Sequence, residues 1–141
     1  MTLDIREVSL STLPEFVLRE ADELECLAGG LDGQMAVKRS VAGSTKAFAH
    51  YADGELLCLW GYRREPEGAT MWLLSTEAVG LHRIAFARTS LVLCEEMLRE
   101  FRAVRCLVHC GHADALKWLG WLGFVRSGSL TANFVYMQKG R

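Results

Sequence analysis

The 141-residue sequence predicts one α/β domain, spanning residues 1–141, with about seven strands and four helices. Strand-like and helix-like hydrophobic patterns follow one another in the order β-α-α-β-β-β-α-β-α-β-β. No internal repeat, low-complexity stretch or linker interrupts that order. A composition of 50% apolar and 23% charged residues is typical of a globular domain, and this length is enough to form a core.

The N-terminal part predicts a short strand and two helices. Polar and apolar residues alternate over residues 2–8, which favours a strand. A helix is expected over residues 14–28, because Ser11 or Thr12 can cap it, Pro14 suits an early helix position and Gly29-Gly30 ends it. A second, shorter helix is expected over residues 34–41.

A β-hairpin is predicted next. Ala52-Asp53-Gly54 is a strong turn signal between apolar runs at residues 46–51 and 55–62. A polar loop should follow over residues 63–68, and then a strand over residues 69–75 that is covered on both faces.

The longest helix should run from about Glu77 to Phe101. It has an apolar stripe at residues three and four apart, formed by Ile84, Ala87, Leu91, Cys94, Leu98 and Phe101, and a second stripe of Phe86, Leu93 and Met97. A strand at residues 104–109, a helix at 113–122 and strands beginning near Phe124 and Asn133 complete the domain.

Charge and composition exclude several classes of function. A net charge of −1 provides no field that would gather nucleic acid or an anionic membrane surface. No apolar run approaches the roughly 20 residues of a membrane span, and the polar, acidic start of the chain is unlike a signal peptide. The five cysteines are an odd number and lie mostly in apolar segments, which predicts reduced thiols in a cytoplasmic protein.

The segment His109-Cys110-Gly111-His112 contains residue types that bind zinc. Adjacent residues at a strand end point in opposite directions, and no Cys-x-x-Cys pair exists elsewhere in the sequence. We therefore predict no metal site.

Residues 112–124 resemble the Asn-x-x-Ala-Ile-x-x-Tyr-x-x-x-Gly-Phe segment of the GNAT superfamily of acyl-CoA-dependent acyltransferases. The order of the predicted elements also matches that superfamily. The resemblance implies a mixed, mostly antiparallel sheet of about 6–7 strands flanked by about four helices.

A closer resemblance is to GNAT-like proteins of tailed phages, the family of internal virion protein A. Four segments carry it: residues 19–28, 52–61, 72–79 and 117–124. This resemblance implies a virion or infection-associated component, present in the virion and in the host cytoplasm, that acts by contacting other phage proteins or host proteins.

GNAT enzymes bind the CoA pyrophosphate on an Arg/Gln-x-x-Gly-x-Gly/Ala turn at the start of the long helix. Here Arg83 matches the first position, but Phe86 and Arg88 occupy the glycine positions. The tyrosine that serves as general acid is replaced by Leu119, and the upstream asparagine by His112. These departures predict a protein without catalysis or cofactor.

The alternative is an acetyl-CoA-dependent N-acyltransferase with an atypical site. In that case the resemblance places the cofactor at Leu74, Ser75, Arg83 and Arg88, and the catalytic candidates are Glu23, Glu25 and His112. Both glutamates also fit a solvated acidic helix face. Trp121 lies on the polar side of its helix, either as an anchor for a partner protein or as a cover for the C-terminal strands.

Overall fold

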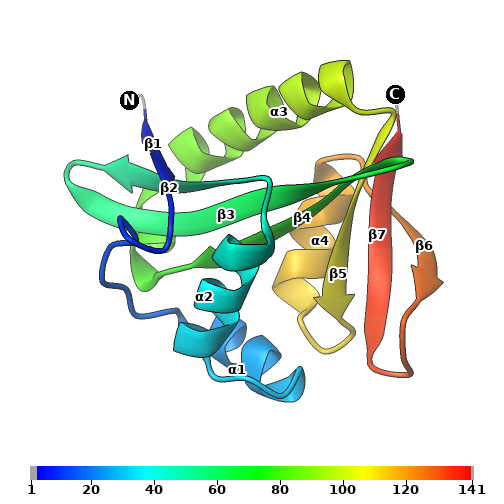
Figure 1. Ribbon diagram of the computed structural model, residues 1–141, viewed down its shortest axis with the longest axis horizontal. Coiled ribbons are helices and arrows are strands. Elements are labelled where there is room, and N and C mark those ends of the chain that lie inside the picture. The colour runs from blue at the N-terminus through cyan, green and yellow to red at the C-terminus, as the bar shows by residue number, and fades with distance from the viewer. Residues whose placement is uncertain (1–2, 141) are drawn as a thin grey trace.

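The computed structural model describes residues 3–140, and its elements follow the predicted order (Figure 1). The strands are β1 (Asp4–Val8), β2 (Lys46–Ala52), β3 (Glu55–Glu65), β4 (Gly68–Ser75), β5 (Ala103–His109), β6 (Val125–Ser129) and β7 (Phe134–Gly140). The helices are α1 (Glu20–Ala28), α2 (Gly33–Gly43), α3 (Arg83–Glu100) and α4 (Ala113–Trp121), with a 3-10 helix (Glu77–His82) before α3. None of the helices in this described part of the chain is both long and apolar enough to cross a membrane.

All seven strands form one sheet in the order β1-β2-β3-β4-β5-β7-β6. Neighbouring strands are antiparallel except β4 and β5, which are parallel. The expected mixed, mostly antiparallel sheet with four α-helices is thus confirmed. Strands β4 and β5 are therefore the junction between the N-terminal strands β1 to β4 and the C-terminal strands β5 to β7.

The two faces of the sheet have separate apolar cores. On one face, residues of α2 and of the segment before α1 pack on β2 and β3, for example Val37 and Phe16 against Ala49. On the other face, α3 and α4 contribute Phe86, Met97 and Leu119 to a larger core. The ribbon in Figure 1 shows α1 and α2 on the opposite side of the sheet from α3 and α4.

The chain before α1 differs from the prediction. Residues 14–19 form neither a helix nor a strand, and the helix begins only at Glu20. Phe16 and Leu18 are buried while Val17 between them is exposed, which is a strand-like period of two. The N–H of Arg19 donates to the carbonyl of Ser75 at 2.9 Å, so this segment follows the sheet instead of forming a helical turn.

The apolar stripe of α3 also differs from the first prediction. Ile84 is 71% exposed, whereas the stripe through Phe86 and Met97 faces the core together with Ser90 and Cys94. The helix begins at Arg83 because a 3-10 helix occupies the six residues before it. The change of helix type rotates the positions that follow relative to a continuous α-helix.

Strands β3 and β4 extend into the segment that was expected to be a polar loop. Only residues 66 and 67 separate the strands, and Gly68 has φ +154°. A Cβ atom at Gly68 would lie 2.2 Å from the carbonyl oxygen of Ala103. Glycine is therefore required where this hairpin approaches the start of β5.

His50 is a buried titratable residue of the larger core. Its side chain is 2% exposed, and its Nε2 atom accepts a hydrogen bond from the indole N–H of Trp60 at 2.6 Å. Because Nε2 accepts, Nδ1 carries the proton, and it has no partner among the residues that the structure describes. Burial lowers the pKa of His50 from 6.5 to about 4.

This histidine predicts a loss of stability in acid. Between pH 6.5 and about 4 the unfolded chain binds a proton that the folded chain excludes, so the free energy of unfolding falls as the pH falls. Over this whole pH range the free energy of unfolding falls by about 3 kcal/mol because of His50. Urea unfolding across this range should show it in the wild type, and His50→Gln should lack that part of the pH dependence. Equal pH dependence in the two proteins would contradict the assignment.

Candidate functional site

The centre of the site is the divergence of β4 and β5. The two strands pair only where residues 69–71 of β4 face residues 104–106 of β5. Beyond Met71 and Cys106 no ladder joins them, although β4 continues to Ser75 and β5 to His109. The two ribbons separate in Figure 1, and α1 lies near their open ends.

Two carboxylates of α1 bind the main chain at these open ends. Asp22 Oδ2 accepts the N–H of Ser75 at 2.6 Å, and Glu25 Oε2 accepts the N–H of His109 at 2.8 Å. One helix therefore bridges the ends of both strands. The three-residue spacing places Asp22 and Glu25 on the same side of α1.

Asp22 is the centre of a buried polar cluster. Its Oδ1 atom lies 2.8 Å from Nε2 of His112, and the two side chains are almost inaccessible to solvent. Arg19 Nε lies 3.2 Å from the same oxygen, but its N–H is not aligned for a hydrogen bond, so this contact is an ion pair. Nδ1 of His112 accepts the N–H of Ala115 at 3.4 Å, which caps α4.

These contacts change the proton affinities of both partners. Burial alone raises the pKa of Asp22, but the hydrogen bonds from His112 and Ser75 and the charge of Arg19 lower it below its usual value. The hydrogen bond to Asp22 raises the pKa of His112, and this outweighs the opposing effect of burial. Asp22 therefore stays ionised, and the cluster binds α1 to the start of α4.

Glu25 differs from Asp22 because one of its oxygens is free. Within residues 3–140, Oε2 is held by His109 and Oε1 has no hydrogen-bonding partner. The side chain is half-buried, and burial raises the pKa of the carboxyl group despite the hydrogen bond from His109. A fixed carboxylate with a free oxygen and a raised pKa is suited to accept a proton.

Glu23 has a different position from the other two predicted catalytic residues. Its Oε2 atom accepts the N–H of Gly33 at 2.6 Å, at the first residue of α2. This contact joins α1 to α2 and stabilises the N-terminus of α2. Glu25 and His112 thus lie together at the open strand ends, and Glu23 does not.

The residues predicted to hold a cofactor are dispersed. Ser75 is buried at the end of β4 with its N–H bound to Asp22, and the Leu74 side chain packs into the core beneath α2. Arg83 is the first residue of α3 and is exposed. Arg88 is also exposed, but five residues along an α-helix correspond to a rotation of about 140°, so the two arginines lie on different sides of α3.

Phe86, which occupies the first glycine position of the GNAT turn, is a core residue. Its side chain is 8% exposed and stacks on Trp118, with ring centroids 5.5 Å apart. The Phe86 side chain therefore points into the core and not toward solvent at the start of α3. The two glycines of the GNAT turn are nevertheless missing, since positions 86 and 88 hold phenylalanine and arginine.

The helix α4 has two relevant positions. Leu119, where the GNAT segment has its tyrosine, is buried in the core. Trp121 is 58% exposed, which agrees with its predicted place on the polar side of the helix. The residues of the His-Cys-Gly-His segment have separate neighbours: His112 contacts Asp22, Nδ1 of His109 accepts the N–H of Gly111, and Cys110 lies near Ala132.

Sequence reasoning missed Asp22 and Arg19. Both belong to the segment of residues 19–28, in which only Glu23 and Glu25 were named as candidates. A usable signal was the spacing of Asp22 and Cys26, which are four residues apart and both buried. An acidic residue on the apolar face of a helix is a candidate for a buried, paired carboxylate.

No protein-family model matches the sequence, and no curated protein is significantly similar to it. Solved structures, however, superpose over nearly the whole chain. The GNAT domain of S. lividans PAT is 15% identical with a TM-score of 0.71, and 97% of this chain and 89% of that chain are covered.

A GNAT family acetyltransferase from Elizabethkingia anophelis with acetyl-CoA bound is 8% identical, with a TM-score of 0.72 and 99% of both chains covered. The chain has the GNAT fold. A third similar structure is the aminoglycoside acetyltransferase AAC(6')-Ib with ribostamycin and coenzyme A, at 17% identity and a TM-score of 0.71, with 100% of this chain and 94% of that chain covered. At these identities the similarity establishes the fold and not the activity.

Parts of the site fit an acyl-CoA. The diverging strands leave unpaired main chain between β4 and β5, and the exposed Arg83 lies at the start of α3. Exposed Leu81 and Ile84 flank this helix start. The fit is looser than a glycine-rich turn would give, since Gly80 is the only glycine between β4 and α3 and has open space around it.

Proposed function

We propose that this chain transfers an acyl group from an acyl-CoA thioester to an amine, with Glu25 as the general base. The observation that carries the proposal is the position of Glu25. Its carboxylate is fixed on the N–H of His109 at the open end of β5, with one oxygen free to accept a proton. The GNAT fold of acetyltransferases supports the same reaction class.

Each group of the site has a defined task in this reaction. The thioester supplies the activated acyl group when it is bound. Arg83 would hold the anionic part of CoA, and Oε1 of Glu25 would remove a proton from the acceptor amine. Asp22 and His112 keep α1 and α4 fixed, so that Glu25 stays at the strand ends.

This chain offers no proton donor at Leu119 or His112, so a departing thiolate would take its proton from solvent. Leu119 is buried and has no proton to donate, and His112 uses both ring nitrogens in contacts with Asp22 and Ala115. A free thiol has a pKa of about 8.5, so protonation of the thiolate near neutral pH needs no dedicated acid.

Binding of acetyl-CoA tests this proposal. A ligand at 100 times its Kd stabilises the folded chain by about 2.7 kcal/mol. Thermal unfolding with increasing acetyl-CoA should therefore show a saturable rise of roughly 8 °C in Tm. Adenosine 3′,5′-bisphosphate serves as a control for binding of the nucleotide part alone. No rise at millimolar acetyl-CoA would contradict the proposal.

A second candidate is a non-catalytic component of a phage particle that acts through protein contacts. It is favoured by Trp121, a large aromatic side chain that is 58% exposed. This function requires an absence of any acetyl-CoA effect on Tm together with the protein's presence in purified particles. Absence from the particles would contradict it.

A further inference from the structure

Two adjoining cavities lie at the end of the sheet away from α1. They have volumes of about 690 and 260 Å³, and together they are within the size range of small-molecule sites. The turn between β3 and β4 forms one wall, and the beginning of β5 and the end of β7 form the other. The residues that line both are Pro66, Glu67, Ala103 and Gln138.

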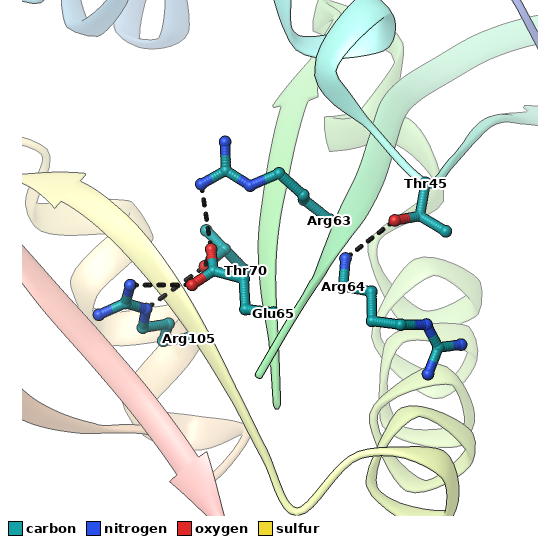
Figure 2. Close-up of polar contacts among 6 residues, drawn as sticks. All are labelled: Thr45, Arg63, Arg64, Glu65, Thr70 and Arg105. Atoms are coloured by element: carbon teal, nitrogen blue, oxygen red, sulfur yellow. Dashed lines mark hydrogen bonds and ion pairs between the residues drawn. The ribbon is translucent and has the colours of Figure 1, made fainter. Parts of the chain in front are cut away.

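Arg105 lines the smaller cavity and is fixed by three neighbours. Its Nη2 donates to Glu65 at 3.2 Å, its Nε donates to Thr70 at 3.3 Å, and the guanidinium lies 4.5 Å from the centre of the Tyr136 ring. Figure 2 shows the remaining terminal nitrogen pointing away from Glu65. Within the described residues this Nη1 atom has no partner. A guanidinium held in this way is pre-organised to bind a carboxylate.

Glu65 is the anchor of this arrangement. Its Oε1 accepts from Thr70 at 2.6 Å and from Arg63 at 3.0 Å, while Oε2 accepts from Arg105, as Figure 2 shows. The hydrogen bonds from Thr70 and Arg63 lower the pKa of Glu65, so it remains ionised at neutral pH. The network thus keeps Arg105 in place and offsets part of its charge.

The larger cavity has two more charges of opposite sign. Glu67 and Arg102 both line it and are both exposed. In the described part of the chain neither side chain forms a hydrogen bond or an ion pair. Gln138 adds an amide that can donate and accept. The cavity therefore presents free cationic and anionic groups to one bound molecule.

We propose that these cavities form a binding site for a small zwitterion, an amino acid or a short peptide, that is separate from the open ends of β4 and β5. The carboxylate of the ligand binds Arg105, and Arg102 adds a second positive charge. The ammonium group of the ligand binds Glu67. A doubly charged phosphate fits less well, because Glu65 and Glu67 both lie at the site.

The test is isothermal titration of the full chain with diglycine, acetate and inorganic phosphate. Diglycine should bind saturably, at least tenfold more tightly than acetate, because acetate lacks the ammonium group. Phosphate should bind more weakly than diglycine. If phosphate binds more tightly, or if diglycine does not saturate, the proposal is overturned.

Two variants test which residue binds the carboxylate of the ligand and which binds its ammonium group. Arg105→Gln should weaken diglycine binding at least tenfold. Glu67→Gln changes an exposed side chain without partners, so the fold is retained; it should weaken diglycine several-fold and leave acetate binding unchanged. Arg126→Gln, an exposed arginine on β6, is the matched control and should have no effect. Unchanged diglycine binding in Glu67→Gln would overturn the zwitterion assignment.

Discussion

Replacing Asp22 with alanine is expected to lower the free energy of unfolding by about 3–5 kcal/mol. Asp22 is 3% exposed and is contacted by His112, Arg19 and the N–H of Ser75. Removing the carboxylate leaves the buried donors of Ser75 and His112 without their acceptor and Arg19 without its counter-charge, and such groups are costly when unpaired. The effect should appear in urea unfolding at pH 7 as a lower midpoint.

Two further variants distinguish the loss of the buried contacts of Asp22 from the loss of one negative charge. Asp22→Asn keeps an oxygen for one donor but removes the charge, so it should fall between the wild type and Asp22→Ala. Asp4→Ala breaks an exposed ion pair with Arg6, which should change stability by less than about 1 kcal/mol. A loss in Asp22→Ala no larger than in Asp4→Ala would show that the cluster does not hold α1.

Replacing Glu25 with glutamine is expected to reduce the rate of acyl transfer by about 10²–10⁴-fold. Glutamine has nearly the same shape, and its amide oxygen can still accept the N–H of His109. The variant should therefore fold and retain acetyl-CoA binding while it loses the base. The measurement is release of free CoA thiol from acetyl-CoA in the presence of a panel of primary amines.

Glu23→Gln is the matched control for this prediction. Glu23 lies on the same helix, but its carboxylate is held by the N–H of Gly33 at the start of α2. Its replacement should change the rate by no more than severalfold. If both variants lose activity to the same extent, or if neither does, Glu25 is not the base.

Much of the fold could be predicted because local patterns specify it. The Asp53-Gly54 turn between two apolar runs fixes the β2–β3 hairpin, and both residues have positive φ as such turns require. The start of α1 could not be predicted, because Pro14 and the hydroxyl residues before it suit a helix start as well as an extended chain. The hydrogen bond from Arg19 to Ser75 decides the outcome, and those residues are 56 positions apart.

The candidate site was only partly predictable for a related reason. Glu25 and His112 were recognised as chemically capable, but their proximity depends on α1 crossing the ends of β4 and β5. The divergence of those strands depends on a pairing of three residues that no local pattern specifies. The direction of the Phe86 side chain could not be predicted either. Its position in the sequence is that of a glycine in the phosphate-binding turn, but its ring packs on Trp118 in the core.

The central claim is that acyl-CoA binds between the open ends of β4 and β5, next to Glu25. Backbone amide NMR of the labelled protein during titration with acetyl-CoA tests it most directly. The largest shifts are expected at Leu73, Ser75, Leu107 and His109, with further shifts at the start of α3 near Arg83. Shifts confined to the region of Ala103 and Gln138 at the other end of the sheet, or no shifts at all, would contradict it.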